Sequence, residues 1–271
     1  AGLGISESTK VVAGAGDNAA AAVGTGVVGE GGCNISLGTS GTVFISSKQF
    51  GMDPNNALHA FAHADGGWHL MGCMLSAASC NKWLCDDILK TTDYAAEQRD
   101  ITPEKLGRNH VYFLPYLMGE RSPINDTNAR GTFIGMTMDT SRSDLVQAVL
   151  EGVAFAIRDS LEVARSLGLD IPSTKICGGG SKSPLWRTIF ANVLGIPLEV
   201  LKTEQGPGYG GAMLAMVGCG RYESVQAAAD ALVEVAGRVE PDPELTARYE
   251  ARYQQFRSIY PALRQVFPQL L

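Results

Sequence analysis

Two consecutive units with the same order, an apolar strand, a glycine-rich turn and a helix, lie in the C-terminal half of this sequence. Residues 175–177 lead through "GGGSKS" to a helix expected over 184–194, and 198–201 lead through "TEQGPGYG" to a helix expected over 211–217. Such units build sheets whose ligands bind where the strands end, since the turns there expose backbone groups and helix N-termini. The pattern predicts an α/β fold.

Further glycine clusters mark strand ends in the N-terminal half. From the N-terminus we expect a short buried strand, a helix, two hairpins and a second helix over residues 11–15, 18–28, 34–46, 57–70 and 74–84. The first hairpin turns at "GTSG" and the second at Asp65-Gly66-Gly67, both of which are turn sequences.

A long amphipathic helix is expected to follow Ser143 and to end near residue 166. Its apolar residues recur at helical spacing, Ser143 is a candidate N-cap, and Gly168 lies just beyond the end. Two closing helices are expected over residues 224–236 and 244–267.

Composition narrows the class of protein. The chain has 271 residues, no basic run and a net charge of −6, which excludes a nucleic-acid-binding surface. No stretch is apolar for long enough to span a bilayer, so no membrane association is expected. The six cysteines form no C-x-x-C pair and the four histidines are dispersed, so we predict no metal site and interpret the cysteines as thiols in a reducing cytoplasm.

Asp17 stands between the strand and the helix expected near the N-terminus. A carboxylate at a strand end can accept a proton from a hydroxyl or hold a metal, and Gly14 and Gly16 leave room for a ligand beside it. The alternative interpretation is an N-cap for the following helix. The residues alone leave both open.

Two glycine turns have the composition of anion-binding loops. "LGTSGT", residues 37–42, offers successive backbone N–H groups and two hydroxyls that can cradle a phosphate, although it can also be an ordinary hairpin turn. "CGGGSKSPLW", residues 177–186, lets a ligand lie against backbone at a helix N-terminus, or only packs a strand tightly on a helix. The charged loop 118–131, with Glu120, Arg121, Asp126 and Arg130, is interpreted as solvated.

The order of these motifs resembles the C-terminal half of the FGGY carbohydrate kinases. After "GERSP", residues 131–151 resemble the second signature of that family throughout, from Gly131 and Phe133 through Asp144 to Glu151. The stretches "HAFAHADGGWHLMGCMLSAASCNKWL" and "FLPYLMGERSPINDTNARGTFIGM" are most similar to the xylulokinase branch of the family. The resemblance implies a ribonuclease-H-like fold of the actin–hexokinase–Hsp70 superfamily, with a mixed sheet flanked by helices.

The resemblance also implies roles for the motifs. Asp17 matches the catalytic base that takes the proton of a sugar hydroxyl, and Asn18 would contact the sugar. The implied phosphate loop is Gly38, Thr39, Ser40 and Gly41, and the implied turn beside adenine and ribose is Gly179, Gly180, Ser181 and Ser183. ATP with Mg²⁺ is the implied cofactor, with no metal ligand assigned in this chain. We expect the three glycine turns, at 38–41, 178–180 and 206–211, to converge near Asp17.

Family members have two such domains with the active site between them. Residues 1–271, which begin at Ala1, are therefore expected to be a C-terminal nucleotide-binding domain whose N-terminal partner domain is not in this sequence, and which is inactive alone. D-xylulose is the implied acceptor and a homodimer is expected. The alternatives are a kinase for ribulose, glycerol or gluconate, and a non-kinase ATPase switch. An NAD-dependent oxidoreductase lacks its glycine fingerprint here.

Overall fold

A seven-stranded mixed sheet forms the centre of the molecule, with strands in the order β3-β4-β2-β1-β7-β8-β9. The computed structural model describes residues 4, 6–203 and 206–270. The strands of the sheet are β1 (Cys33–Leu37), β2 (Gly41–Ser47), β3 (His59–Ala62), β4 (Trp68–Met74), β7 (Thr174–Cys177), β8 (Leu198–Leu201) and β9 (Val235–Val239). A separate ribbon pairs β5 (Tyr112–Leu114) with β6 (Thr132–Ile134).

The sheet combines four antiparallel strands with three parallel ones. The antiparallel strands lie in the order β1-β2-β4-β3, in which β1 pairs with β2 and β3 with β4, so both expected hairpins are confirmed. Parallel pairing joins β1 to β7, with Ser36 opposite Cys177, and β7 to β8, with Ile176 opposite Val200. The carboxyl ends of these three strands therefore lie at one edge of the sheet, and each leads into a glycine-rich segment.

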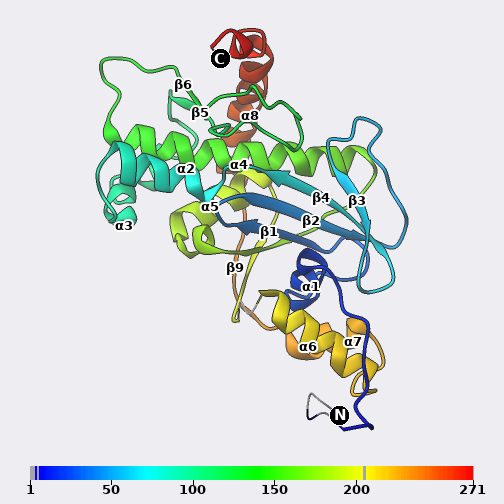
Figure 1. The fold of residues 1–271 in the computed structure, drawn as a ribbon. Coiled ribbons are helices and arrows are strands. Elements are labelled where there is room, and N and C mark those ends of the chain that lie inside the picture. Colours follow the sequence, from blue (N-terminus) through cyan, green and yellow to red (C-terminus); the bar gives the residue numbers. More distant parts are fainter. Residues whose placement is uncertain (1–3, 5, 204–205, 271) are drawn as a thin grey trace.

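Helices cover both faces of the sheet (Figure 1). On one face lie α4 (Arg142–Ser166) and α5 (Pro184–Leu194), with α8 (Pro243–Leu263) beyond them, and on the other lie α1 (Asp17–Gly24), α6 (Gly206–Gly218) and α7 (Val225–Leu232). Short helices complete the chain: α2 (Ala78–Lys82), a π-helical segment Trp83–Ile88, α3 (Tyr94–Gln98), and single turns Pro103–Lys105, Gly179–Lys182 and Phe267–Leu270. In the described part of the chain, no helix combines the length and apolar composition needed to cross a bilayer.

The α4 helix is the centre of the main core. Its buried side chains include Val146, Val149, Val153, Ile157 and Leu161, which recur at the spacing that predicts a buried helix face. The N-cap is Ser141, two residues before the predicted one: Ser141 accepts a hydrogen bond from the Asp144 N–H, and the Asp144 carboxylate accepts one from the Ser141 N–H. The prediction of Ser143 as the N-cap is wrong, because only Ser141 has an acidic residue three positions later with which it can form this reciprocal pair of hydrogen bonds, a capping box.

Several further predicted elements differ from the structure. The helix expected over 74–84 begins at Ala78, because β4 runs to Met74, and the helix expected over 18–28 ends at Gly24. Residues 11–15 form no strand and Val11 is 93% exposed. This apolar run has no described neighbouring strand with which to pair. The α6 helix begins at Gly206, within the segment predicted as a turn, whose residues 204–205 lie outside the described residues. The helix predicted over 224–236 ends at Leu232, and β9 follows, paired antiparallel with β8.

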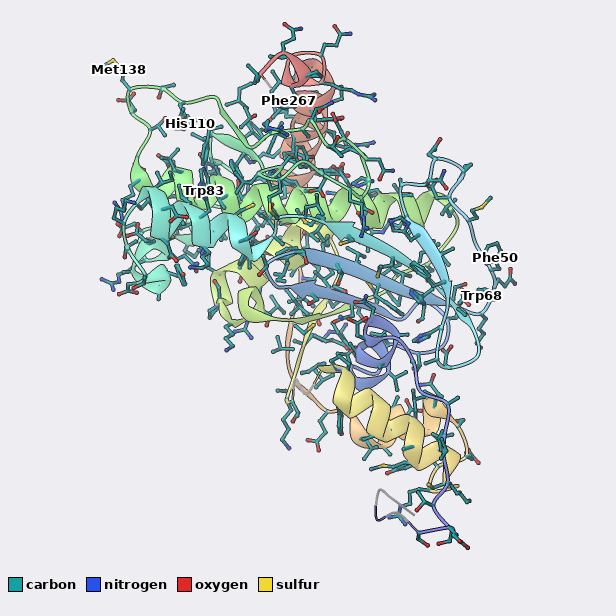
Figure 2. All side chains as sticks on the ribbon, viewed as in Figure 1. Phe50, Trp68, Trp83, His110, Met138 and Phe267 are labelled. Carbon is teal, nitrogen blue, oxygen red and sulfur yellow. The ribbon has the colours of Figure 1, made fainter. Side chains whose placement is uncertain are left out.

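Exposed aromatic side chains gather near the edge strand β3. Phe50 and Trp68 meet edge to face with ring centroids 4.9 Å apart, and Figure 2 shows them close together on one side of the molecule. Phe61 and Met52 are also exposed. Such an edge is a surface that another chain or domain can cover. The expected homodimer stays a prediction.

Candidate nucleotide site

The loop between β1 and β2 presents unpartnered donors to solvent. Gly38 donates its N–H to the Ser40 carbonyl at 3.1 Å, which closes the turn. Thr39 and Ser40 are exposed, and neither their N–H groups nor their hydroxyls donate to any described residue. Backbone N–H groups and hydroxyls held in this way suit the oxygens of a phosphate.

The carbonyl side of the same loop is fixed by the segment that follows β4. Ala77 donates its N–H to the Thr39 carbonyl at 2.9 Å, and Ala78 donates to the Gly38 carbonyl at 2.9 Å. Ser79 adds its hydroxyl to the Thr39 carbonyl at 2.7 Å. The buried Gly41 packs against this segment too, since a Cβ there would lie 3.0 Å from the Ala77 Cβ. Residues 77–79 thus hold the loop with its donors outward.

The turn after β7 packs directly on the end of β1. Gly178 has φ +89°, and a Cβ on it would lie 2.7 Å from the Leu37 carbonyl oxygen, so both its conformation and its neighbour require glycine. A Cβ on Gly180 would lie 2.9 Å from both the Leu37 Cβ and the Trp186 ring. Leu37 immediately precedes the first loop, so the structure brings the two glycine turns side by side.

Within this second turn, the predicted site residues divide by exposure. Gly179 is exposed and a Cβ there would contact nothing within 4 Å. Ser181 is buried and donates to the Gly178 carbonyl at 2.8 Å. Ser183 is the N-cap of α5, accepts the Trp186 N–H at 3.1 Å and donates to Gln98 at 2.6 Å. Both hydroxyls hold the turn in shape, whereas Gly179 leaves open space.

Asp17 is the first residue of α1 and is exposed. The N-cap is Gly16, and no side chain caps the helix, so the interpretation of Asp17 as an N-cap is wrong. Its only hydrogen bond among the described residues is from the adjacent Asn18 N–H, at 2.8 Å. Asn18 is exposed as well. The carboxylate is therefore available to a ligand.

In the third glycine segment, 206–211, Gly210 packs against α1, whereas a Cβ on Gly206, Gly208 or Gly211 would meet nothing within 4 Å. A Cβ on Gly24 would lie 2.9 Å from the Gly210 N and 3.0 Å from the Gly206 carbonyl oxygen. These glycines let α1 and α6 cross at backbone contact. The α6 helix follows β8, which ends at the same edge of the sheet as the strands that lead into the other two turns. The contact of α6 with α1 therefore links Asp17, the first residue of α1, to that edge.

Glu120 differs most from its sequence-based interpretation. It was expected in a solvated loop but is only 2% exposed. Its Oε1 accepts the Leu75 N–H at 2.8 Å and the Arg121 N–H at 2.7 Å, while its Oε2 has no partner among the described residues. Burial raises the pKa of this carboxyl to about 7, and the two N–H bonds lower it in part. An apolar run before the loop and Pro123 within it are the only local signals of this burial.

The histidines are less dispersed than their sequence positions predict. His63 and His69 lie with ring centroids 5.7 Å apart, and His69 stacks on Phe44 at 4.0 Å. His63 Nε2 lies 2.9 Å from the Val27 carbonyl oxygen. No group of three or more potential ligands suited to a metal ion occurs among the described residues. Burial, with a smaller effect of His63, lowers the pKa of His69 to about 4.

The comparisons with known proteins agree with this fold. Residues 33–219 match the FGGY family of carbohydrate kinases, C-terminal domain. Xylulose kinase of Escherichia coli is 39% identical over 265 residues, covering 93% of this chain and 52% of that protein, and xylulose kinase of Staphylococcus epidermidis is 33% identical over 270 residues, covering 99% and 54%. The chain thus spans about half the length of the curated relatives it matches.

Solved structures give the same result. A protein described as a xyloylose kinase from Brucella ovis has a TM-score of 0.87 at 39% identity, covering 93% of this chain and 52% of that one. Ligand-bound xylulose kinase from Lactobacillus acidophilus has a TM-score of 0.91 at 25% identity, covering 99% and 55%. The fold is that of the sugar kinases of the actin–hexokinase–Hsp70 type, as the sequence predicts. The chain belongs to the FGGY family of carbohydrate kinases.

Proposed function

We propose that this chain is the nucleotide-binding, C-terminal half of a two-domain kinase that transfers the γ-phosphoryl group of ATP to a hydroxyl of D-xylulose. The observation that carries the proposal is the contact of the two glycine turns through Leu37, where exposed donors of Thr39 and Ser40 lie beside the open space at Gly179. The relatives named xylulose kinase support the acceptor, and their double length supports a further N-terminal domain.

The proposed transfer assigns one task to each segment. The N–H groups of the loop at Thr39 and Ser40 bind phosphate oxygens and stabilise the charge that the transfer moves. The turn at Gly179 lies beside adenine and ribose. Asp17 accepts the proton of the sugar hydroxyl as that oxygen attacks the γ-phosphorus, the bond to the β–γ bridging oxygen breaks, and ADP leaves. Asn18 contacts the sugar.

Magnesium fits this arrangement as a companion of the nucleotide. Mg²⁺ usually keeps several waters and is held by one or two carboxylates together with substrate phosphates. The Asp17 carboxylate is exposed at a helix start and accepts one local hydrogen bond, so an oxygen remains for the ion or for a water bound to it. When bound, Mg²⁺ neutralises phosphate charge during transfer.

The test uses the full-length protein. Asp17→Asn should lower kcat with D-xylulose by about 10²–10⁴-fold, the usual contribution of a general base, and leave ADP affinity within about twofold. The matched control is Asp87→Asn, which changes an exposed carboxylate on another part of the surface and should keep wild-type turnover. Retention of turnover by Asp17→Asn within a few-fold would remove Asp17 from the chemistry. A panel of ribulose, glycerol and gluconate tests the acceptor.

A further inference from the structure

Glu120 is connected to the phosphate loop through one short segment of backbone. Its Oε1 accepts the Leu75 N–H at 2.8 Å. Two and three residues later, Ala77 and Ala78 donate to the carbonyl groups of the loop at 2.9 Å each. A single carboxylate oxygen therefore fixes the start of the segment whose other end holds Thr39.

The loop that carries Glu120 is anchored to β4 and to the C-terminal helix. Ser122 donates its N–H to the Cys73 carbonyl at 3.0 Å, so the loop follows the end of β4. Glu120 and Asp126 exchange backbone hydrogen bonds at 2.8 and 2.9 Å, and Asp126 accepts the Tyr260 hydroxyl at 2.8 Å. These hydrogen bonds fix the backbone of Glu120, so its side chain can set the position of Leu75.

Buried polar atoms without hydrogen-bond partners occur at and near Glu120. Its Oε2 has no partner, and the buried hydroxyls of Ser76 and Ser122, on the two segments that it joins, have none either among the described residues. A buried polar atom without a hydrogen bond destabilises the folded state. Buried unpaired atoms on the two segments that lead to the phosphate loop indicate a requirement other than stability, which is typical of functional sites.

We propose that Glu120 is a positioning residue for nucleotide binding, which acts through residues 75–79 to hold the loop at Thr39 and Ser40 with its donors toward the phosphates. The inference rests on the proposed function, since it requires a phosphate at this loop. Glu120 itself contacts no nucleotide. It limits the freedom of the loop, so that the donors are in place before the ligand arrives.

The proposal predicts a loss that depends on phosphate. Glu120→Met removes the acceptor of the Leu75 N–H and keeps an unbranched side chain of similar length. It should weaken ADP binding by about tenfold, which is the size expected for one lost hydrogen bond, and should leave adenosine binding within about twofold. Glu120→Gln keeps a carbonyl oxygen at the same place and should bind both ligands as the wild type does.

The experiment is calorimetric titration of the full-length wild type and variants with ADP and with adenosine, well below the unfolding temperature of each protein. Tyr260→Phe is the control, because it removes the hydrogen bond to Asp126 in the same loop and leaves Leu75 untouched. It should keep the wild-type ratio of ADP to adenosine affinity even where its melting temperature falls.

The outcomes separate the two proposals. If wild-type protein binds neither ligand, the proposed function fails. If wild-type protein binds ADP better than adenosine and Glu120→Met keeps that ratio, or loses both affinities equally, the positioning role of Glu120 is overturned and the proposed function stands. Loss of the ratio in Glu120→Met with rescue in Glu120→Gln supports the proposal.

Discussion

Gly210 of α6 lies against the backbone of Ala20 in α1, so close that a Cβ on Gly210 would stand 1.7 Å from the Ala20 carbonyl oxygen. Helices cross at such short range only where one of them has no side chain. From the resemblance to the kinase family we expected the glycine turn at 206–211 to converge with the other two turns near Asp17. The structure shows that Gly210, together with Gly24 of α1, allows the contact between the two helices, one of which begins with Asp17.

Gly210→Ala should therefore separate α1 from α6 and destabilise the purified chain by at least about 1–3 kcal/mol, the usual cost of overpacking. Gly211→Ala is the matched control, because its Cβ would contact nothing within 4 Å and alanine favours a helix over glycine. Urea unfolding of the two variants measures the difference. Equal stabilities would contradict the close crossing.

Substitutions at the neighbouring glycines 179 and 180 should affect different properties, ADP binding at Gly179 and stability at Gly180. Gly179→Val places a side chain in the open space beside the proposed adenine position and should weaken ADP binding by about tenfold, or ~1.4 kcal/mol, with little change in stability. Gly180→Ala drives a Cβ against Leu37 and Trp186 and should lower stability by about 1–3 kcal/mol. ADP titration and thermal unfolding of both variants provide the test. Unchanged ADP affinity in Gly179→Val would place the adenine elsewhere.

A buried ion pair fastens α8 to α4. Arg252 Nη2 lies 3.0 Å from Glu151 Oε2, and the side chains are 8% and 1% exposed. Tyr249 donates its hydroxyl to Glu151 Oε1 at 3.0 Å, and Gln147 donates to the same oxygen at 2.8 Å. Glu151 ends the stretch that resembles the family signature, and the structure gives it a packing role.

Removal of one partner from this pair leaves a buried charge without compensation. Arg252→Met should cost about 3–5 kcal/mol in the free energy of unfolding. The control is Lys202→Met, which breaks the pair with Glu234, whose side chains are 63% and 66% exposed, and should change stability by no more than about 1 kcal/mol. Similar losses in both variants, measured by chemical denaturation, would argue against a structural role for the buried pair.

Local signals predicted the elements that carry their own start and stop residues. The bounds of α5 agree with the prediction because Ser183 caps the helix, Pro184 is its first residue and Gly195 adopts φ +66° after its end. The first hairpin is confirmed for the same kind of reason, whereas α4 was predicted from its apolar spacing and the cap assigned to it, Ser143, was wrong. Local pattern is sufficient where capping and turn chemistry decide the structure.

The features that were missed depend on distant neighbours. The run 11–15 is as apolar as a strand but has no described strand beside it, and β9 forms because β8 offers an edge for pairing. Glu120 is buried because Cys73 of β4 and Leu75, just after that strand, lie against its loop, although both are far away in the sequence. The two glycine turns were predicted as phosphate and nucleotide loops, but their contact through Leu37 requires the parallel pairing of β1 with β7.

His69 should make the protein sensitive to acid. Its pKa falls from an ordinary 6.5 to about 4 on folding, so between these values the unfolded chain binds a proton that the folded chain does not. Stability from this group therefore falls as the pH drops from about 6.5 to 4, by up to about 3 kcal/mol. His69→Phe, which keeps a ring on Phe44, should lose less stability than the wild type over this range. Parallel curves of unfolding free energy against pH would contradict the assignment.

The contribution of Glu120 to stability should change with pH in the direction opposite to that of His69. Its carboxyl has a pKa of about 7 in the folded protein against an ordinary 4.5, so the folded chain binds the extra proton between these values. Its contribution is fully present below pH 4.5 and is lost as the pH rises through 7, a change of about 3 kcal/mol. Glu120→Gln stays neutral, keeps the acceptor for Leu75 and should gain stability over the wild type as the pH rises from 5 to 8. Urea midpoints measured at several pH values test the sign, and a variant that instead loses stability toward pH 8 would show that the folded protein favours the charged carboxylate.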